Sequence, residues 1–446
     1  MFAKVLVANR GAVAARVIRT LNRLGVASVA VFSDADRDNP YVAAAGEARH
    51  IGAAAPRESY LDIDRLIAAA RDAHADAVHP GYGFLSENPE FARRVAAAGL
   101  TFIGPSPAMI EAMGHKTQAR DLVRQHGMPM NAGSGVLPAD AGVIAAEAER
   151  IGYPVLVKPA AGGGGIGMIE ARDAAALLPA VDRAASMAAR GFGSGEVYLE
   201  RLIDRPRHVE FQMLGDKHGR VRHLFERDCS VQRRHQKVIE EARAPGLSLD
   251  AADTMGRRIA ETLARLGYDN IGTVEMLMGA DGSFHFLEMN TRLQVEHGVT
   301  EEITGIDLVE AQIRAALGEG LDTILPAEIV PRGHAVQARV YAEDPKRFFP
   351  SPGRLAVFRP PADGSVRVET GYAEGGEVTP FYDPMIAKVI AHGPTREAAI
   401  DRLAAGLAQF EISGVKHNIP ALQAVLASAE FRSGAVHTGL LSTIKL

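Results

Sequence analysis

The N-terminal part of the chain alternates short apolar runs with longer amphipathic stretches. Apolar side chains recur at helical spacing between the first two runs, and Gly25 ends the expected helix. Parallel strands joined by helices are typical of a doubly wound α/β domain, which we expect over 1–113, with functional loops near 9–11 and 79–83. The buried strands predicted here lie at 4–8, 27–32, 76–79 and 100–103.

A second pattern begins near Gly114. A glycine-rich stretch at 162–167 lies between two strand-like runs, with helix patterns around them. We interpret 132–203 as a small lid subdomain inserted in a central domain that covers 114–330. The elements predicted here are a helix at 116–126 and strands at 153–158 and 196–199.

The last part of the chain, 331–446, is expected to be a strand-rich domain that two helices close. The strands are predicted at 334–342, 355–358, 366–369 and 385–390, and the helices at 395–410 and 419–429. The expected fold class is therefore α/β, or α+β over the whole chain, in three parts.

A β-hairpin is predicted around Asp281-Gly282, because this dipeptide is the strongest short signal for a two-residue turn. Counting outward from the turn pairs Glu275 with Glu288 on one face of the sheet. The strand-like runs cover 273–279 and 283–290, and the expected pairs nearer the turn are 280 with 283, 279 with 284, and 277 with 286.

The paired carboxylates point to a metal. Facing acids destabilise a sheet unless a positive charge lies between them, and a hard divalent cation satisfies that need. Asn290 lies on the same face as Glu275 and Glu288 and adds an amide oxygen. The alternative is a solvated face with unrelated acids, and a register slip by one residue would separate the pair.

Polar residues continue this face at every second position: Glu288, Asn290, Arg292, Gln294 and Glu296. If the chain stays extended, all five line one surface. Arg292 can then stabilise an anion, and Glu296 can act as a general base. An exposed strand would also explain the polar residues, but not why they continue the metal face.

Two further segments indicate phosphate or anion binding. The glycines of 162–167 can wrap phosphates with backbone N–H groups, and Lys158 would face those phosphates, although a flexible linker looks alike. The spacing matches neither a Walker A loop nor a dinucleotide fingerprint. The basic segment 232–237 is interpreted as an anion site rather than a solvated patch, whereas His208 alone would more often be structural.

Composition narrows the class of protein. The chain has 446 residues, 47% of them hydrophobic and 23% charged, as in a globular protein of several domains. Its net charge of −5 argues against a nucleic-acid partner. The single cysteine, Cys229, fits a reducing cytoplasm. Arg10 and Arg16 interrupt the first apolar stretch, and no apolar run could span a bilayer, so we expect a cytoplasmic protein without a signal peptide or membrane segment.

Ordered motifs run along essentially the whole chain besides the glycine-rich segment: 8–11, 79–88, 207–210, 226–230, 232–237, 288–297, 342–345 and 382–386. Together they resemble the biotin carboxylases of the ATP-grasp superfamily. The resemblance implies an N-terminal biotin carboxylase domain, a central ATP-grasp domain with a mobile glycine-rich lid, and a C-terminal biotin carboxylase domain, in the ranges given above. It also implies a homodimer.

The resemblance implies the substrate contacts as well. ATP would contact Lys116, Lys158, Gly164, Gly165, Glu200, Arg201, Ile203, His208, His235, Glu275 and Glu288. Mg²⁺ or Mn²⁺ would be held by Glu275 and Glu288, with Asn290 nearby. Bicarbonate would lie among Lys237, Arg292, Gln294 and Val295, and biotin beside Tyr82 and Arg339.

These residues imply a reaction through carboxyphosphate. Glu296 would deprotonate bicarbonate, which attacks the γ-phosphate of ATP, with Lys237 and Arg292 neutralising charge. Carboxyphosphate would break down to carbon dioxide and phosphate, and phosphate would take the ureido proton of biotin. Arg339 would stabilise the resulting oxyanion.

The acceptor and the partners are less constrained. No Met-Lys-Met biotinylation segment or carboxyltransferase region is present, so we expect a separate biotin carboxyl carrier and a carboxyltransferase subunit. The leading expectation is an acyl-CoA carboxylase. Ile166, where many acyl-CoA members have Arg or Lys, keeps a urea or amide carboxylase open. A non-catalytic nucleotide-binding paralogue is the third alternative, because the family usually has Glu at Ala12 and Pro at Gly298; Thr is usual at His417.

Overall fold

The N-terminal part folds around a five-stranded parallel sheet with the order β3-β2-β1-β4-β5. The computed structural model describes residues 1–160 and 167–445, without the side chains of Lys116 and Phe192. The strands are β1 Lys4–Val7, β2 Ala27–Ser33, β3 Glu47–Gly52, β4 Ala77–His79 and β5 Thr101–Phe102. The helices are α1 Gly11–Arg23, α2 Pro40–Ala44, α3 Ile63–Asp72 and α4 Pro89–Ala97, with short turns η1 Asp34–Asp36 and η2 Pro56–Glu58.

Local chemistry explains the start of α4. The Asn88 side chain accepts the backbone N–H of Phe91, and Pro89 occupies the first turn of α4, which is a favourable helix start. The sequence pattern missed β3, because this edge strand carries the polar residues Glu47, Arg49 and His50 instead of an apolar run.

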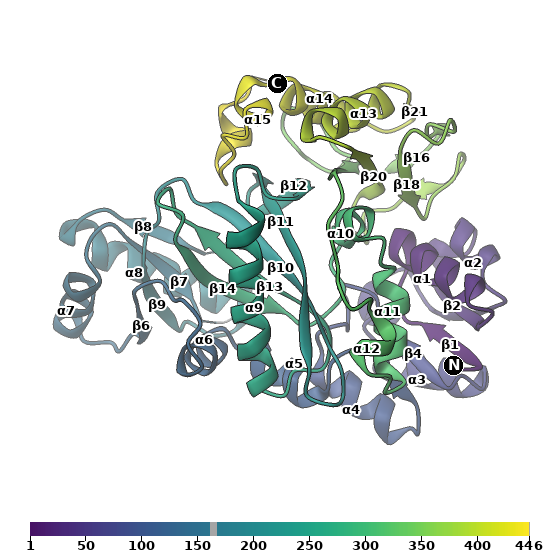
Figure 1. Ribbon diagram of the computed structural model, residues 1–446, viewed down its shortest axis with the longest axis horizontal. Coiled ribbons are helices and arrows are strands. Elements are labelled where there is room, and N and C mark those ends of the chain that lie inside the picture. Colours follow the sequence, from purple (N-terminus) through teal and green to yellow (C-terminus); the bar gives the residue numbers. More distant parts are fainter. Residues whose placement is uncertain (161–166, 446) are drawn as a thin grey trace.

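A second, smaller sheet has the antiparallel order β6-β9-β7-β8 and lies within the segment expected to be an inserted subdomain. Its elements are β6 Gly133–Val136, α7 Ala141–Ile151, β7 Val155–Pro159, β8 Ile169–Ala171, α8 Ala174–Phe192 and β9 Val197–Arg201. Helices α5 Pro107–Gly114 and α6 Lys116–Gln125 precede it. Figure 1 shows this subdomain at the opposite end of the molecule from α1 and β1. Its motion as a lid stays a prediction.

An eight-stranded sheet, β14-β13-β10-β11-β12-β15-β20-β18, forms the centre of the molecule. Helix α9 (Leu249–Arg265) packs against β11 on one face of this sheet (Figure 1). The other strands are β10 Arg207–Gly215, β11 Val221–Arg233, β12 Gln236–Ala242, β13 Asn270–Met278, β14 Phe284–Asn290, β15 His334–Tyr341, β18 Arg367–Thr370 and β20 Met385–Gly393. Helices α10 His297–Thr304, α11 Leu308–Ala316 and α12 Leu321–Ile324 lie between β14 and β15 in the chain.

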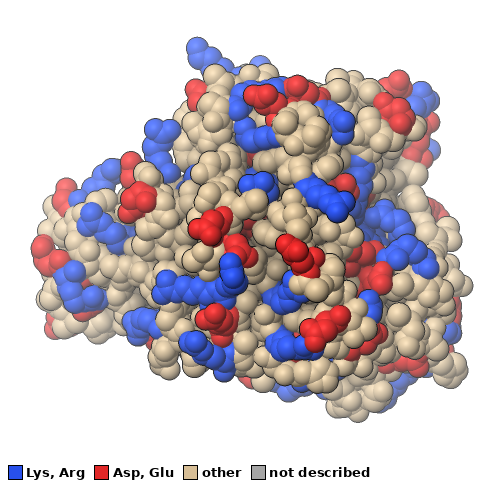
Figure 2. Space-filling view, viewed as in Figure 1, with Lys and Arg blue, Asp and Glu red and all other residues tan. Residues whose placement is uncertain are grey.

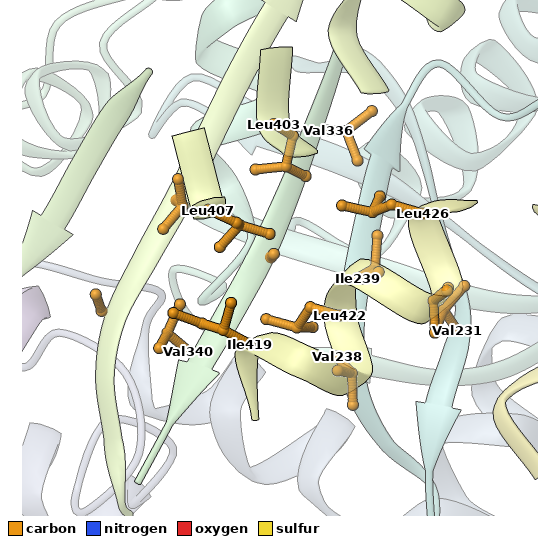
Figure 3. Close-up of a cluster of buried hydrophobic side chains, with 14 of the residues drawn as sticks. Val231, Val238, Ile239, Val336, Val340, Leu403, Leu407, Ile419, Leu422 and Leu426 are labelled. Atoms are coloured by element: carbon orange, nitrogen blue, oxygen red, sulfur yellow. The ribbon is translucent and has the colours of Figure 1, made fainter. Parts of the chain in front are cut away.

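The sheet continues across the boundary expected near residue 330, since β12 pairs with β15. One apolar core covers both sides of this junction. It includes Val238 and Ile239 of β12, Val336 of β15, Leu403 of α13 (Arg396–Ala408) and Leu422 of α14 (Ile419–Ala427) (Figure 3). The remaining C-terminal elements are β16 Gly353–Arg354, β17 Val357–Arg359, β19 Glu377–Val378, β21 Glu411–Ser413, α15 Ala429–Arg432 and η3 Leu440–Thr443.

The structure thus has the mixed α/β architecture expected from the sequence, with a parallel N-terminal sheet and antiparallel sheets beyond it. Acidic and basic side chains are interspersed over the face seen in Figure 2, without a continuous basic stripe on that face. Within the described part of the chain, no helix has the length and apolarity that crossing a membrane requires.

Candidate active site

The predicted hairpin brings Glu275 of β13 opposite Glu288 of β14. The pairing nearer the turn is one residue away from the expected one: the structure pairs Met278 with Phe284 and Met276 with Phe286. The expected pairs 279–284 and 277–286 are therefore wrong. A β-bulge at Leu287 adds one residue to β14, and this addition restores the pairing of the two acids.

Glu275 lies in a dense polar environment. Its Oε1 accepts hydrogen bonds from Lys237 Nζ at 2.7 Å and from Asn290 Nδ2 at 2.9 Å, and its Oε2 lies 3.1 Å from His208 Nε2. Although burial alone would raise the pKa of Glu275, Lys237 and His208 hold that pKa well below its usual value. Burial alone would lower the pKa of His208, but Glu275 and Glu210 together raise it to about 9.

The oxygen donors at the hairpin fit a hard cation. Glu275 and Glu288 are directly paired, so two carboxylates come from adjacent strands, and Asn290 adjoins Glu275 through its Nδ2 while its Oδ1 accepts from Arg292. A second group, His208, Glu210 and Glu275, also brings potential ligand atoms together. Lys237 Nζ lies 2.5 Å from Glu210 and 2.7 Å from Glu275, so a lysine already supplies positive charge to that group.

The chain does not stay extended after Asn290, so the condition under which all five polar side chains would line one strand face is not met. β14 ends at Asn290, the following residues turn, and Glu296 becomes the N-cap of α10. The polar side chains still converge, because the turn directs Gln294 toward Glu275 at 3.4 Å and Glu296 toward Lys237. The convergence comes from the loop rather than from strand alternation.

Glu296 is fully buried between two cations. Lys237 Nζ donates to its Oε1 at 2.7 Å, and Arg339 Nη2 donates to its Oε2 at 3.1 Å. Burial alone would raise the pKa of Glu296, but the charge of Lys237, reinforced by Arg339, lowers it. The carboxylate is therefore ionised at neutral pH and can accept a proton.

Arg339 lies on β15 beside a cavity of about 410 Å³. Its Nε donates to the buried Glu240, whose second oxygen accepts from Gln337 Nε2 at 3.0 Å. Tyr82 also lines the cavity, so the two residues expected to contact biotin share one space. The other lining residues are Asn9, Arg10, Gly11, Ala12, Gly83, Phe84, Gln236, Arg292, Val295, Tyr341, Phe381, Tyr382, Asp383 and Met385.

Arg292 connects the loop after β14 to the N-terminal domain. Its Nε donates to Glu87 Oε2 at 2.8 Å, and its Nη2 donates to Asn290 Oδ1 at 2.9 Å. The other Glu87 oxygen accepts the Thr291 N–H at 3.0 Å. The Nη1 of Arg292 donates to Gln294 Oε1 at 3.0 Å, so Arg292 and Gln294 form one polar group beside Val295.

The expected nucleotide residues gather at the junction of the small and large sheets. Lys158 of β7 donates to Glu200 of β9 at 2.7 Å, and both are buried. Arg120 of α6 also pairs with Glu200. Burial and the charge of Lys158 lower the pKa of His235, which lies in the turn before β12. Arg201 ends β9, and Ile203 follows it.

Some expected contacts fall outside the described residues. These are Gly164, Gly165, Ile166 and the side chain of Lys116. The ATP contacts proposed for them stay predictions, and so does the effect of Ile166 on the acceptor.

Four charged residues at the site were not singled out from the sequence: Glu87, Arg120, Glu210 and Glu240. Glu87 and Glu210 lie within recognised motifs, which was the available signal. Glu210 accepts from Lys237 and also, at 2.6 Å, from Arg227 Nε, so it holds Lys237 in place. Glu240 is two residues before the end of β12 and gains its role only through pairing of β12 with β15.

The structure shows the surroundings of Ala12 and Gly298, two positions at which the sequence departs from the family pattern. Ala12 lines the cavity, where it presents only a methyl group. Gly298 lies against Ile390, and a Cβ built on Gly298 would be 2.4 Å from Ile390 Cδ1. A larger residue at 298 therefore requires Ile390 to move. Neither departure removes a proposed catalytic group, although Ala12 places a methyl group where the family usually has a carboxylate.

Comparisons with known proteins match this geometry. Family models for the biotin carboxylase N-terminal domain, the carbamoyl-phosphate synthase L chain ATP-binding domain and the biotin carboxylase C-terminal domain match residues 1–110, 115–324 and 337–443. Biotin carboxylase 2 of Bacillus subtilis is 49% identical, with 99% of each chain covered. The biotin carboxylase of Halalkalibacterium halodurans is 48% identical, over 99% of this chain and 98% of the relative.

Solved structures show the same fold. The biotin carboxylase of Campylobacter jejuni, solved as a β,γ-ATP complex, has a TM-score of 0.95 at 40% identity, with 99% of each chain covered. The biotin carboxylase domain dimer of Hydrogenobacter thermophilus 2-oxoglutarate carboxylase, solved with MgADP and bicarbonate, has a TM-score of 0.94 at 42% identity, over 99% of this chain and 98% of that one. The chain therefore belongs to the biotin carboxylase family, whose members are ATP-dependent ligases of the ATP-grasp type.

Proposed function

We propose that this chain transfers a carboxyl group from bicarbonate to carrier-bound biotin, with Glu296 as the base. The arrangement that carries the proposal is the buried triad Lys237–Glu296–Arg339. It joins the group around Glu275 to the cavity that Arg339 and Tyr82 line. A proton acceptor thus lies between the expected metal pair and the expected biotin pocket.

The residues divide between two partial reactions. Glu296 takes the proton of bicarbonate, whose oxygen attacks the γ-phosphorus of ATP and displaces ADP, giving carboxyphosphate. Lys237 and Arg292 neutralise the developing charge, and Gln294 and Val295 complete the bicarbonate site. Glu275 and Glu288, with Asn290, would hold Mg²⁺ or Mn²⁺, which supplies charge neutralisation to the phosphates.

Carboxyphosphate then yields carbon dioxide and phosphate. Phosphate removes the N–H proton of the biotin ureido group, and the ureido nitrogen attacks carbon dioxide. Arg339 stabilises the ureido oxyanion, while Tyr82 forms a wall of the pocket. At the nucleotide end, Lys158, Glu200, Arg201, Ile203, His208 and His235 are proposed to contact ATP, with Lys116, Gly164 and Gly165.

The proposed partners are a second copy of this chain, a biotin carboxyl carrier protein and a carboxyltransferase subunit. The relatives support this, because they include components of pyruvate, methylcrotonoyl-CoA and propionyl-CoA carboxylases and a biotin carboxylase dimer. We infer an acyl-CoA acceptor and a cytoplasmic location, the latter because the single cysteine, Cys229, is buried and unpaired.

The test measures ATP cleavage by the purified protein with Mg²⁺, with and without bicarbonate and free biotin. We expect cleavage that requires bicarbonate and rises with biotin. A folded protein that binds ATP but shows no bicarbonate-dependent cleavage would contradict the proposal. Copurification of the native complex, followed by carboxylation assays with acyl-CoA and urea, identifies the acceptor.

A further inference from the structure

Two backbone carbonyls of the loop between β14 and α10 are held by buried side chains. Lys388 Nζ donates to the Val295 carbonyl oxygen at 2.9 Å. His297 Nδ1 lies 2.7 Å from the Gln294 carbonyl oxygen, where it donates as N–H. The two acceptors are consecutive, so each of the two peptide planes at the centre of the loop is held by one side chain.

Fixing these carbonyls also directs the following N–H groups. The C=O and N–H of a trans peptide point in opposite directions, and both peptides here are trans. The Val295 N–H therefore points away from His297, and the Glu296 N–H points away from Lys388. Val295 lines the cavity beside Arg292, and among residues 1–160 and 167–445 neither N–H has a hydrogen-bond acceptor. Two adjacent, unused N–H groups can bind an anion.

Lys388 is rigidly placed for this task. It lies on β20 with no exposed surface, and its Nζ pairs with Glu369 of β18 at 2.6 Å. Glu369 is also paired with Arg16 and Arg367, and both of these arginines bind Glu301 of α10. Arg19 also pairs with Glu369, at 2.9 Å, so Lys388 shares this carboxylate with three arginines. The ammonium group uses its remaining hydrogen-bonding capacity on the loop carbonyl.

We propose that Lys388 is a positioning residue that acts through the Val295 carbonyl and, together with His297, presents two backbone N–H groups to bicarbonate. The inference rests on the proposed function and deepens it. Lys388 itself does not contact bicarbonate. It fixes the orientation of the peptide whose N–H group would bind bicarbonate. A role in stability alone would require only the Lys388–Glu369 pair, and it would leave the affinity for bicarbonate unchanged.

The test compares Lys388→Met with Lys4→Met in the full chain. Lys4 is a matched control, because its Nζ also pairs with a glutamate, Glu47 at 3.0 Å, and donates to a backbone carbonyl, that of Ala73 at 2.8 Å, in the N-terminal domain. We expect Lys388→Met to raise the KM for bicarbonate about tenfold or more, the loss typical of a hydrogen bond to a charged group. The KM for ATP should stay within about twofold of wild type. Lys4→Met should change neither constant.

A folded Lys388→Met protein whose KM for bicarbonate equals that of wild type would overturn the inference. If Lys388→Met does not fold, His297→Leu and Lys388→Arg decide instead: His297→Leu should raise the KM for bicarbonate, and Lys388→Arg should raise it less than His297→Leu does. Unchanged values in both would also overturn the inference. Failure of the proposed function is distinguishable, because wild type and Lys4→Met would then lack bicarbonate-dependent cleavage too.

Discussion

Lys237 and Glu296 form a buried ion pair with 2.7 Å between Nζ and Oε1, and the same Nζ lies 2.7 Å from Glu275. One cation therefore contacts both the expected base and Glu275, one member of the expected metal pair. It lowers the pKa of each carboxylate while Glu210 anchors it from a third side at 2.5 Å. Loss of Glu296 should consequently lower the rate of ATP cleavage but leave in place the positive charge of Lys237 near the nucleotide site.

Glu296→Ala should abolish bicarbonate-dependent ATP cleavage. Removal of a general base typically costs about 10² to 10⁴ in rate. Lys237 keeps its pairs with Glu210 and Glu275, so ATP affinity should change little. Steady-state cleavage and calorimetric ATP binding measure the two quantities separately. Retained turnover would show that Glu296 is not the base.

Glu275→Gln and Glu288→Gln should each raise the Mg²⁺ concentration needed for half-maximal turnover. Each change removes one anionic ligand from the paired set, and the remaining oxygens bind a hard cation less well. A titration of turnover against Mg²⁺ at fixed ATP checks this. Asp281→Asn, at the exposed turn of the same hairpin, is the control and should leave the titration unchanged. A Mg²⁺ requirement unaffected in both glutamate variants would contradict the metal assignment.

Glu240→Gln should weaken the response to biotin more than the response to bicarbonate. Glu240 holds Arg339 Nε and is fully buried, so an amide there loosens the arginine that lines the cavity. We expect biotin-stimulated cleavage to fall about 10- to 100-fold, as for residues that orient a functional group. The KM for bicarbonate should change less. Assays that vary free biotin and bicarbonate independently make this comparison, and an equal effect on both would argue against it.

His79 should make the protein less stable in acid. Its Nδ1 accepts the Gly81 N–H at 3.0 Å, just before Tyr82, and burial lowers its pKa from 6.5 to about 3. The unfolded chain binds the proton more readily, so this contribution is complete above pH 6.5 and is lost as pH falls from 6.5 toward 3. The loss is about 1.4 kcal/mol per pH unit.

Denaturant unfolding from pH 7 to pH 4, with His79→Gln as the comparison, measures this slope. The variant lacks the titrating ring, so its free energy of unfolding should fall less steeply with acid. Parallel curves for the two proteins would show that His79 does not contribute.

Individual strands and helices were predicted from the sequence more accurately than the pairing between strands. The strands near residues 4, 27 and 385 and the helix after Lys116 follow from apolar periodicity and from glycine or proline at their ends. The bulge at Leu287 has no such signal, because an apolar residue suits both a regular and a bulged strand. The hairpin and the pairing of Glu275 with Glu288 were predicted, although the pairing between the turn and these two residues was wrong by one residue.

The site itself depends on contacts between distant segments. Arg292 pairs with Glu87, Lys237 with Glu210 and Arg339 with Glu240. In each pair the two residues belong to different strands or loops that are distant in the sequence. Spacing along one strand cannot identify such partners. The turn after Asn290 was missed for a related reason: alternation of polar residues indicates a strand, but here α10 begins at that place and the buried cations fix the loop.

The continuous sheet has a consequence for how the chain can be divided. A cut near residue 330 would separate β12 from β15 and split the core that includes Val238, Val336 and Leu422. Each piece would then expose an unpaired strand edge beside apolar side chains, which favours association. The two pieces should therefore fold poorly alone. When mixed, they should associate by pairing β12 with β15 and so restore the folded structure, as complementing fragments do.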